Sequence, residues 1–179
     1  MRKAIIVIMV LAICAAFAVG CSGLENLTVD DISVIVEENG YFTLMAYDTD
    51  GSLVGTLKHS KEGWEFIDQL GNEAYQKEVD GKIYSYLRKK GAESWEVTSK
   101  SISKEIIDEL RVFLDPKAYK DNGDGTYTYL GKDGMPAEDV STIKVEKKKI
   151  TLYIGGVRYE LTDIGKTTID FPADLPPIE

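Results

Sequence analysis

The sequence contains very few of the residues that support thiol, redox or metal chemistry. It has two cysteines, Cys14 and Cys21, among 179 residues. Both belong to the N-terminal segment, so residues 22–179 contain no thiol. This excludes disulfides, thiol nucleophiles, CxxC redox motifs and thiolate zinc sites from the rest of the chain. The fold must therefore rely on its core for stability.

Histidine is equally scarce, since His59 is the only one. A general base or a catalytic triad needs a histidine that a carboxylate orients beside a nucleophile. The neighbours Ser60 and Glu62 are ordinary turn residues. We therefore expect His59 to be a solvated loop residue, and we expect no catalytic residue, no cofactor and no enzymatic activity.

Two acidic loops, residues 48–52 and 121–126, have the composition of calcium-binding loops but not their spacing. An EF-hand loop needs an Asp at its first position and a Glu at its twelfth, with a glycine at the sixth. With Gly51 or Gly125 as the sixth residue, neither loop meets this requirement. We expect hairpin turns in both places and no metal site.

The one long apolar run, residues 4–19, is shorter than the roughly 20 residues that a membrane-spanning helix needs. It follows Arg2 and Lys3, which is typical of a secretory signal peptide. The run ends in AVGCSG, residues 18–23, where small residues precede Cys21. An uncleaved anchor, or a secreted protein whose cysteine is incidental, is the alternative interpretation.

AVGCSG resembles the lipobox of bacterial lipoproteins. In that family the cysteine receives a diacylglyceryl group, and cleavage leaves it as the first residue. The resemblance implies a signal peptide over residues 1–20, lipidation of Cys21, a short tether over residues 21–29 and a single β-rich domain over residues 30–179. It places the protein outside the cytoplasm, anchored to a membrane by lipid.

Acidic residues outnumber basic ones, 30 to 21. Removing Arg2 and Lys3 with the signal peptide changes the formal net charge from −9 to −11. A surface this acidic disfavours binding to nucleic acid and electrostatic docking on anionic lipid. The partners that remain are the membrane, through the anchor, a hydrophobic small molecule or lipid, and a protein.

Short runs rich in Val, Ile, Tyr and Thr alternate with glycine-containing turn signals from residue 30 onward. The signals are Asn39-Gly40, Asp50-Gly51, Gly71-Asn72, Asp80-Gly81, Gly91, Asp124-Gly125, Asp133-Gly134 and Gly155-Gly156. Asn-Gly and Asp-Gly tolerate the positive φ angles of tight hairpins. We expect about ten short strands in one antiparallel sheet, with residues 30–58 among the strands.

One segment has helical rather than strand periodicity. Ile102, Ile106, Leu110 and Phe113 recur at helical spacing and form an apolar stripe that suits a sheet face. Pro116 ends the pattern because the residue before a proline avoids the α region. We expect one helix over residues 102–114, and a proline-rich tail, residues 171–179, that leaves the fold as an extended end.

Aromatic residues suggest where a ligand would bind. Tyr84 and Tyr86 share one strand face, and Phe42 and Leu44 share a face of another strand. Strands that are apolar on both faces lie between packed layers or beside a cavity. Tyrosine suits the wall of such a cavity, because its ring is apolar and its hydroxyl can reach water. These four residues and Trp95 are our candidates for binding a hydrophobic ligand. The alternative is an ordinary core with surface tyrosines.

From about residue 60 to residue 172, the order of elements resembles the extracytoplasmic lipoprotein-carrier-like superfamily, which includes glycolipid-binding surface lipoproteins. The closing stretch YELTDIGKTTIDFP, residues 159–172, carries much of the likeness. The resemblance implies a curved half-barrel sheet whose concave face is covered by helices and holds acyl chains. This chain departs from it over residues 30–58, where the family has a long amphipathic helix.

These observations predict a mainly β fold: a single curved antiparallel half-barrel with one principal helix on its concave face. The function we expect is that of a non-enzymatic, membrane-tethered lipoprotein that binds a hydrophobic ligand or lipid. The alternative is an envelope protein-interaction module, an accessory subunit or inhibitor with a solid core.

Overall fold

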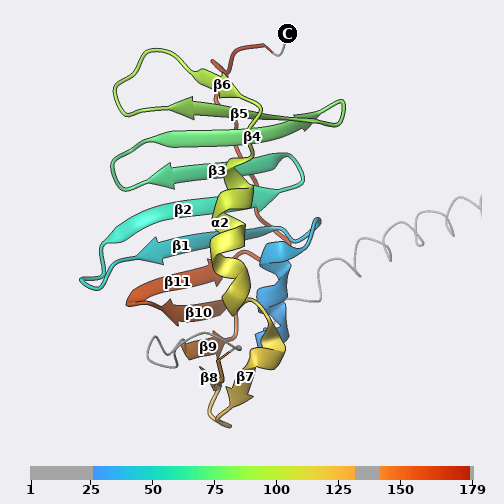
Figure 1. The fold of residues 1–179 in the computed structure, drawn as a ribbon, viewed down its shortest axis with the longest axis vertical. Coiled ribbons are helices and arrows are strands. Elements are labelled where there is room, and N and C mark those ends of the chain that lie inside the picture. Colours follow the sequence, from blue (N-terminus) through green and yellow to red (C-terminus); the bar gives the residue numbers. More distant parts are fainter. Residues whose placement is uncertain (1–25, 132–141, 178–179) are drawn as a thin grey trace, which may run out of the picture.

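The fold is a single open antiparallel sheet of eleven strands with helices against one face (Figure 1). It is seen in a computed structural model that describes residues 26–131 and 142–177. The prediction of a mainly β protein built on one antiparallel sheet is confirmed. The sheet does not close into a barrel, because β6 and β7 are free edges at its two ends.

The described part of the chain begins with a 3-10 helix and five consecutive hairpin-linked strands, followed by a short edge strand. These are η1 (Val29–Val36), β1 (Phe42–Tyr47), β2 (Leu53–Ser60), β3 (Gly63–Asp68), β4 (Glu73–Val79), β5 (Lys82–Arg88) and β6 (Glu96–Thr98). The helical segment then comprises α2 (Ile102–Leu110), η2 (Arg111–Phe113) and η3 (Pro116–Ala118). The last strands are β7 (Tyr119–Asp121), β8 (Thr126–Tyr129), β9 (Thr142–Glu146), β10 (Lys149–Ile154) and β11 (Val157–Thr162).

The strand order explains why a helix crosses the sheet. The strands lie in the order β6-β5-β4-β3-β2-β1-β11-β10-β9-β8-β7, so each half of the chain forms a meander and the two halves join where β1 pairs with β11. The chain must return from one edge of the sheet to the other after β6. Helix α2 makes this crossing over one face, and η1 lies beside it on the same side (Figure 1).

The predicted helix is confirmed, because α2 and η2 together cover residues 102–113. Ser101 caps its first turn, where the hydroxyl oxygen accepts a hydrogen bond from the Lys104 backbone N–H. Ile107 and Leu110 are buried, and Ile106 is half-buried.

Several of the predicted hairpin turns are confirmed. Asp50-Gly51, Asp80-Gly81 and Gly155-Gly156 each join two neighbouring antiparallel strands. Asp80 and Gly81 have φ angles of 53° and 74°, the left-handed conformation that a two-residue hairpin requires. Asp133-Gly134 lies outside the described residues.

The prediction that residues 30–58 are all strand is wrong at its start. Residues 29–36 form η1, whose first turn is capped reciprocally by Thr28 and Asp31. Ile32 and Ile35 lie three residues apart and are both buried on one side of η1. Asn39-Gly40 therefore joins a helix to β1 and not two strands. Gly40 is needed there because a Cβ would collide with the carbonyl of Val34.

The sheet has a separate apolar cluster on each face. The larger one fills the space between the sheet, η1 and the helical segment, and it includes Phe42, Leu57, Leu110, Ile143 and Leu161. The smaller one lies on the opposite face and consists of Tyr75, Tyr86 and Ile169, with Tyr84, Trp95, Phe171 and Leu175 packed against it.

The smaller cluster corrects the expectation that the C-terminal tail leaves the fold. Phe171 and Leu175 of the tail pack on Tyr75 and Tyr86, together with Ile169 just before the tail. Their apolar side chains follow a strand-like alternation that the prolines further along obscure. The tail is therefore part of the folded domain as far as Leu175.

Candidate functional site

The N-terminal end of α2 rests on polar side chains of the sheet. The Oε1 atom of Gln76, in β4, accepts hydrogen bonds from the Ile102 backbone N–H at 3.0 Å and the Ser101 hydroxyl at 3.1 Å. Its Nε2 atom donates to the Ser103 hydroxyl at 3.0 Å. Ser85, the cross-strand partner of Gln76, donates to the Lys100 carbonyl at 2.6 Å. Gln76 thus positions the helix by hydrogen bonds and not by apolar packing.

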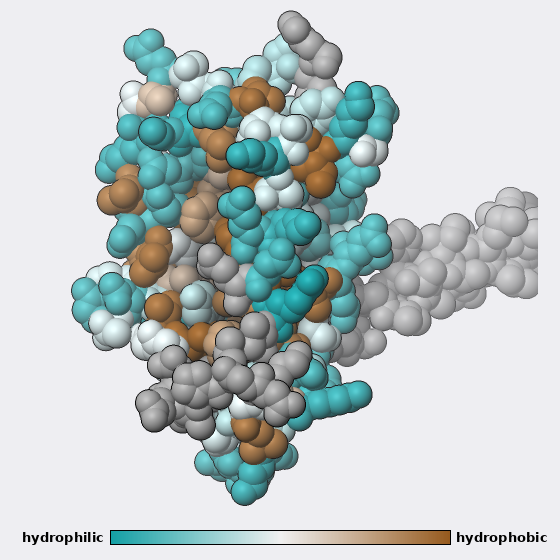
Figure 2. All heavy atoms as spheres, viewed as in Figure 1, coloured by the Kyte–Doolittle hydropathy of each residue, from teal (hydrophilic) through white to brown (hydrophobic). Residues whose placement is uncertain are grey.

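An apolar hollow of about 530 Å³ lies on one side of this support. Its floor consists of Phe66, Ala74 and Leu87, which are successive cross-strand partners in β3, β4 and β5. The β5–β6 connection, with Ala92 and Trp95, closes its outer end. The space-filling view of this face shows apolar patches set among hydrophilic ones (Figure 2).

Arg88 holds the rim of the apolar hollow in place. Its guanidinium forms ion pairs with Glu73 at 3.0 Å and with Asp174 of the tail at 2.7 Å. It also lies over the Trp95 ring, 4.1 Å from the centroid. Both carboxylates neutralise Arg88, whereas Lys89, the other cation of the lining, forms no ion pair with a described side chain.

A larger and more polar hollow, of about 890 Å³, lies beside α2. It is formed at the opposite ends of β3, β4 and β5, between the β2–β3 turn, the end of η1 and one side of α2. Its lining includes His59, Trp64 and Gln76 on the sheet and Ile107 on the helix. The two hollows thus lie at opposite ends of the same strands, and only the polar one is lined by side chains of α2.

His59 is not the solvated loop residue that the sequence suggested. It lies in β2 with only 7% of its surface exposed, and its ring stacks on that of Trp64 with 3.8 Å between centroids. A carbonyl oxygen can only accept, so Nδ1 carries the proton and donates to the Gly40 carbonyl at 2.8 Å. Burial lowers the pKa of His59, and the hydrogen bond to Gly40 opposes that shift only in part.

This pKa shift predicts how stability depends on pH. The unfolded chain takes up a proton on His59 near pH 6.5, while the folded chain takes it up only at lower pH. The contribution of His59 to the free energy of unfolding should therefore be fully present above pH 6.5. Below pH 6.5 the free energy of unfolding should fall by up to about 1.4 kcal/mol per pH unit. Urea unfolding at pH 7.5, 6.5 and 5.5 measures the slope, and the variant His59→Gln should lose it. An equal slope in both proteins would contradict the assignment to His59.

The structure separates the five residues that the sequence suggested as one ligand site. Phe42 and Leu44 are buried in the larger cluster on the helix side. Tyr84, Tyr86 and Trp95 belong to the cluster on the opposite face, under the tail. Of the five, only Trp95 also lines a hollow. They do not form a common lining.

The residues that form the floor of the apolar hollow were missed, although the sequence contained a signal for two of them. Leu87 lies on the strand face opposite to Tyr84 and Tyr86, and Phe66 alternates with Glu65 in β3. Ala74 carries no signal of its own, because a small residue is equally common on either face. Only the strand register brings the three together.

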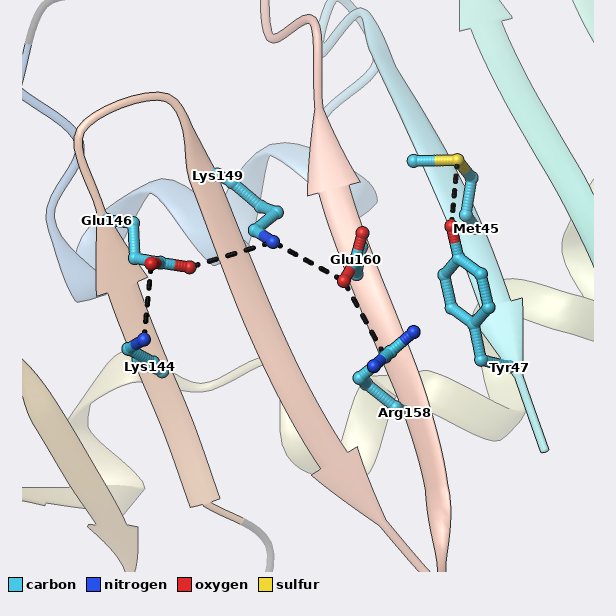
Figure 3. Close-up of polar contacts among 7 residues, drawn as sticks. All are labelled: Met45, Tyr47, Lys144, Glu146, Lys149, Arg158 and Glu160. Carbon is cyan, nitrogen blue, oxygen red and sulfur yellow. Dashed lines mark hydrogen bonds and ion pairs between the residues drawn. The ribbon is translucent and has the colours of Figure 1, made fainter. Parts of the chain in front are cut away.

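The face opposite to the helices carries paired charges on β9, β10 and β11. Lys144, Glu146, Lys149, Glu160 and Arg158 form a continuous row with N···O distances of 3.1 to 3.7 Å (Figure 3). Lys144 and Glu146 are exposed, so their ion pair contributes little to stability, whereas the Glu160 side chain is only 15% exposed. Since each charge has an opposite neighbour, we place no binding site there.

Three further sequence-based predictions concern lipidation, metal binding and membrane-spanning helices. Cys21 lies outside the described residues. Within residues 26–131 and 142–177, no group of three or more His, Asp or Glu side chains is placed to hold a metal ion. No helix in that part of the chain is long and apolar enough to cross a membrane.

Comparison with known proteins adds no family. A scan against protein-family models gave no match, and a search of curated proteins found no significant relative.

Proposed function

We propose that this protein is an extracytoplasmic lipoprotein, tethered to a membrane through Cys21, that binds a hydrophobic or amphipathic ligand on the helix-covered face of its sheet. In this proposal the sheet acts as a half-barrel with α2 on its concave side. The protein is a binding protein and not an enzyme. The lipobox-like sequence supports the tether, and the apolar hollow supports the ligand.

The apolar hollow is the observation on which the ligand proposal rests. Its volume of about 530 Å³ lies within the usual range of small-molecule sites, roughly 300–1,000 Å³. Phe66, Ala74 and Leu87 supply a continuous apolar floor three strands wide. Each methylene buried there contributes about 0.8 kcal/mol, so a chain of about twelve carbons has ample gross driving force before ordering costs.

A fluorescent acyl probe with a chain of about twelve carbons tests the proposal. We expect the domain from Leu24 to Glu179, made without its anchor, to bind the probe with saturation. The variant Leu87→Trp should weaken binding at least about tenfold, because the indole would occupy the hollow. Leu130→Trp is the matched control, since Leu130 is exposed and remote from the hollow. It should bind like the parent.

Two results would contradict the ligand proposal: no saturable binding by a correctly folded domain, or equal loss in Leu87→Trp and Leu130→Trp. The alternative function, that of a protein-interaction module, would then be favoured. One observation favours it independently, since β6 is a free edge of the sheet and Val97 at its centre is 46% exposed. Such an edge can pair with an added strand.

A further inference from the structure

The polar hollow beside α2 combines aliphatic walls with a polar interior. Ile35 of η1, Ile83 of β5 and Ile107 of α2 contribute apolar surface from three different elements. Ser101, Gln76 and His59 contribute polar groups between them. A ligand that fits this lining needs both a hydrocarbon portion and groups that form hydrogen bonds.

The charges around the hollow favour a cation. Five carboxylates line it: Glu37, Glu38, Glu62, Glu78 and Asp108. Glu62 pairs with Lys61, and Asp108 pairs with Arg111. The Lys77 side chain lies on the opposite face of the sheet, where its ammonium is 4.0 Å from the Phe171 ring centroid. Among the described side chains, Lys104 is the only remaining cation to set against Glu37, Glu38 and Glu78.

His59 adds an independent observation, because it presents a hydrogen-bond acceptor to this hollow. Its Nδ1–H donates to the Gly40 carbonyl, so Nε2 of the neutral ring carries a lone pair. No described residue donates to Nε2, although the side chain is more than nine-tenths buried and lines the hollow. Nε2 is not among the fully buried polar atoms without a partner, so it is open to the hollow and can accept a hydrogen bond from a ligand that brings an N–H or O–H group.

We propose that the polar hollow binds a small aliphatic cation with two or more ammonium groups, a polyamine. One ammonium donates to His59 Nε2, a second lies near Glu78, and the methylenes between them contact the isoleucine walls. Ammonium groups only donate, which matches a site that offers a lone pair and carboxylates. An anion would meet an excess of carboxylates and is disfavoured.

This site is separate from the one that the acyl probe tests. The apolar and polar hollows lie at opposite ends of β3, β4 and β5 and share no lining residue. The two proposals therefore fail or succeed independently, and both ligands can be bound at once.

Titration calorimetry with spermidine tests the inference on the full-length chain in uncharged detergent micelles. We expect saturable binding of one spermidine per chain. The variant Glu78→Gln should weaken binding at least about fivefold, because it removes one carboxylate from the site. Glu93→Gln is the matched control: it changes the net charge equally, and Glu93 is exposed and outside both hollows. It should leave the affinity within about twofold.

A second pair of variants examines His59 while allowing for its structural role. Asn at position 59 keeps a donor near the Gly40 carbonyl but has no acceptor where Nε2 was. Gln reaches the Nε2 position. We expect His59→Asn to weaken spermidine binding at least about fivefold and His59→Gln to retain most of it, with thermal unfolding showing that each variant is folded.

The inference is overturned by any of three results. The first is the absence of saturable spermidine binding. The second is an equal loss of affinity in Glu78→Gln and Glu93→Gln, which would indicate general attraction to an acidic protein. The third is equal binding of 1,8-octanediol, an uncharged chain of similar length, which would show that the ammonium groups are not recognised.

Discussion

Replacing Cys21 with alanine is expected to abolish lipid anchoring. The thiol is the only group in the lipobox-like AVGCSG stretch to which a thioether-linked lipid can be attached. Two acyl chains hold a protein firmly at a membrane, whereas one gives only marginal binding. The variant should incorporate no labelled fatty acid, and it should either appear in the soluble fraction or accumulate as an uncleaved precursor. Detergent partitioning and the mass of the chain distinguish these two forms.

The control for this experiment is Cys14→Ala. Cys14 lies inside the apolar run that the signal-peptide interpretation removes, so its loss should leave both acylation and partitioning unchanged. If Cys21→Ala is still acylated and partitions into detergent like the parent, the lipoprotein interpretation is wrong. If Cys14→Ala alone releases the chain, the cleavage site has been misplaced.

The sheet was predictable because its turns are encoded locally. Asp80-Gly81 and Gly155-Gly156 adopt the positive φ angles of tight hairpins whatever lies elsewhere in the chain. A series of such turns between apolar runs yields meanders, and the single segment with helical spacing, residues 102–114, yields the crossing helix. Local signals thus determined the element types and most of the hairpins.

Residues 29–36 were misassigned because two local signals conflict there. The β-branched run ISVIV favours a strand by composition. The Thr28–Asp31 capping box and the three-residue spacing of Ile32 and Ile35 favour a helical turn, and burial of both isoleucines decides in favour of the turn. The strand propensity of a short segment is overridden when tertiary packing buries the side chains that lie at helical spacing.

The ligand site was less predictable than the fold, because a site depends on which strand faces come together. Alternation showed that Tyr84 and Tyr86 share a face, but it could not show that the tail covers that face. Nor could it show that Phe66, Ala74 and Leu87 are aligned in register on the other. His59 illustrates the same limit: its burial depends on Trp64 across the strand pair and on the Gly40 carbonyl, 19 residues away.

The second large effect is expected at the centre of the crossing helix. Leu110 is 7% exposed and belongs to the larger apolar cluster, so Leu110→Ala should lower the free energy of unfolding by about 2–5 kcal/mol. Ile106→Ala should cost less, because Ile106 is only half-buried at the edge of that cluster. Urea unfolding monitored by circular dichroism measures both losses.

Lys104→Ala is the matched control on the same helix, because Lys104 is exposed and its truncation should change stability by no more than about 0.5 kcal/mol. The ordering Leu110, then Ile106, then Lys104 tests how α2 is seated. Its N-terminal end is held by hydrogen bonds to Gln76, whereas the end that carries Leu110 is held by apolar contact. A loss below about 1 kcal/mol for Leu110→Ala would mean that the helix is not packed on the sheet. The polar hollow, which Ile107 of α2 lines, would then lack a fixed wall on that side.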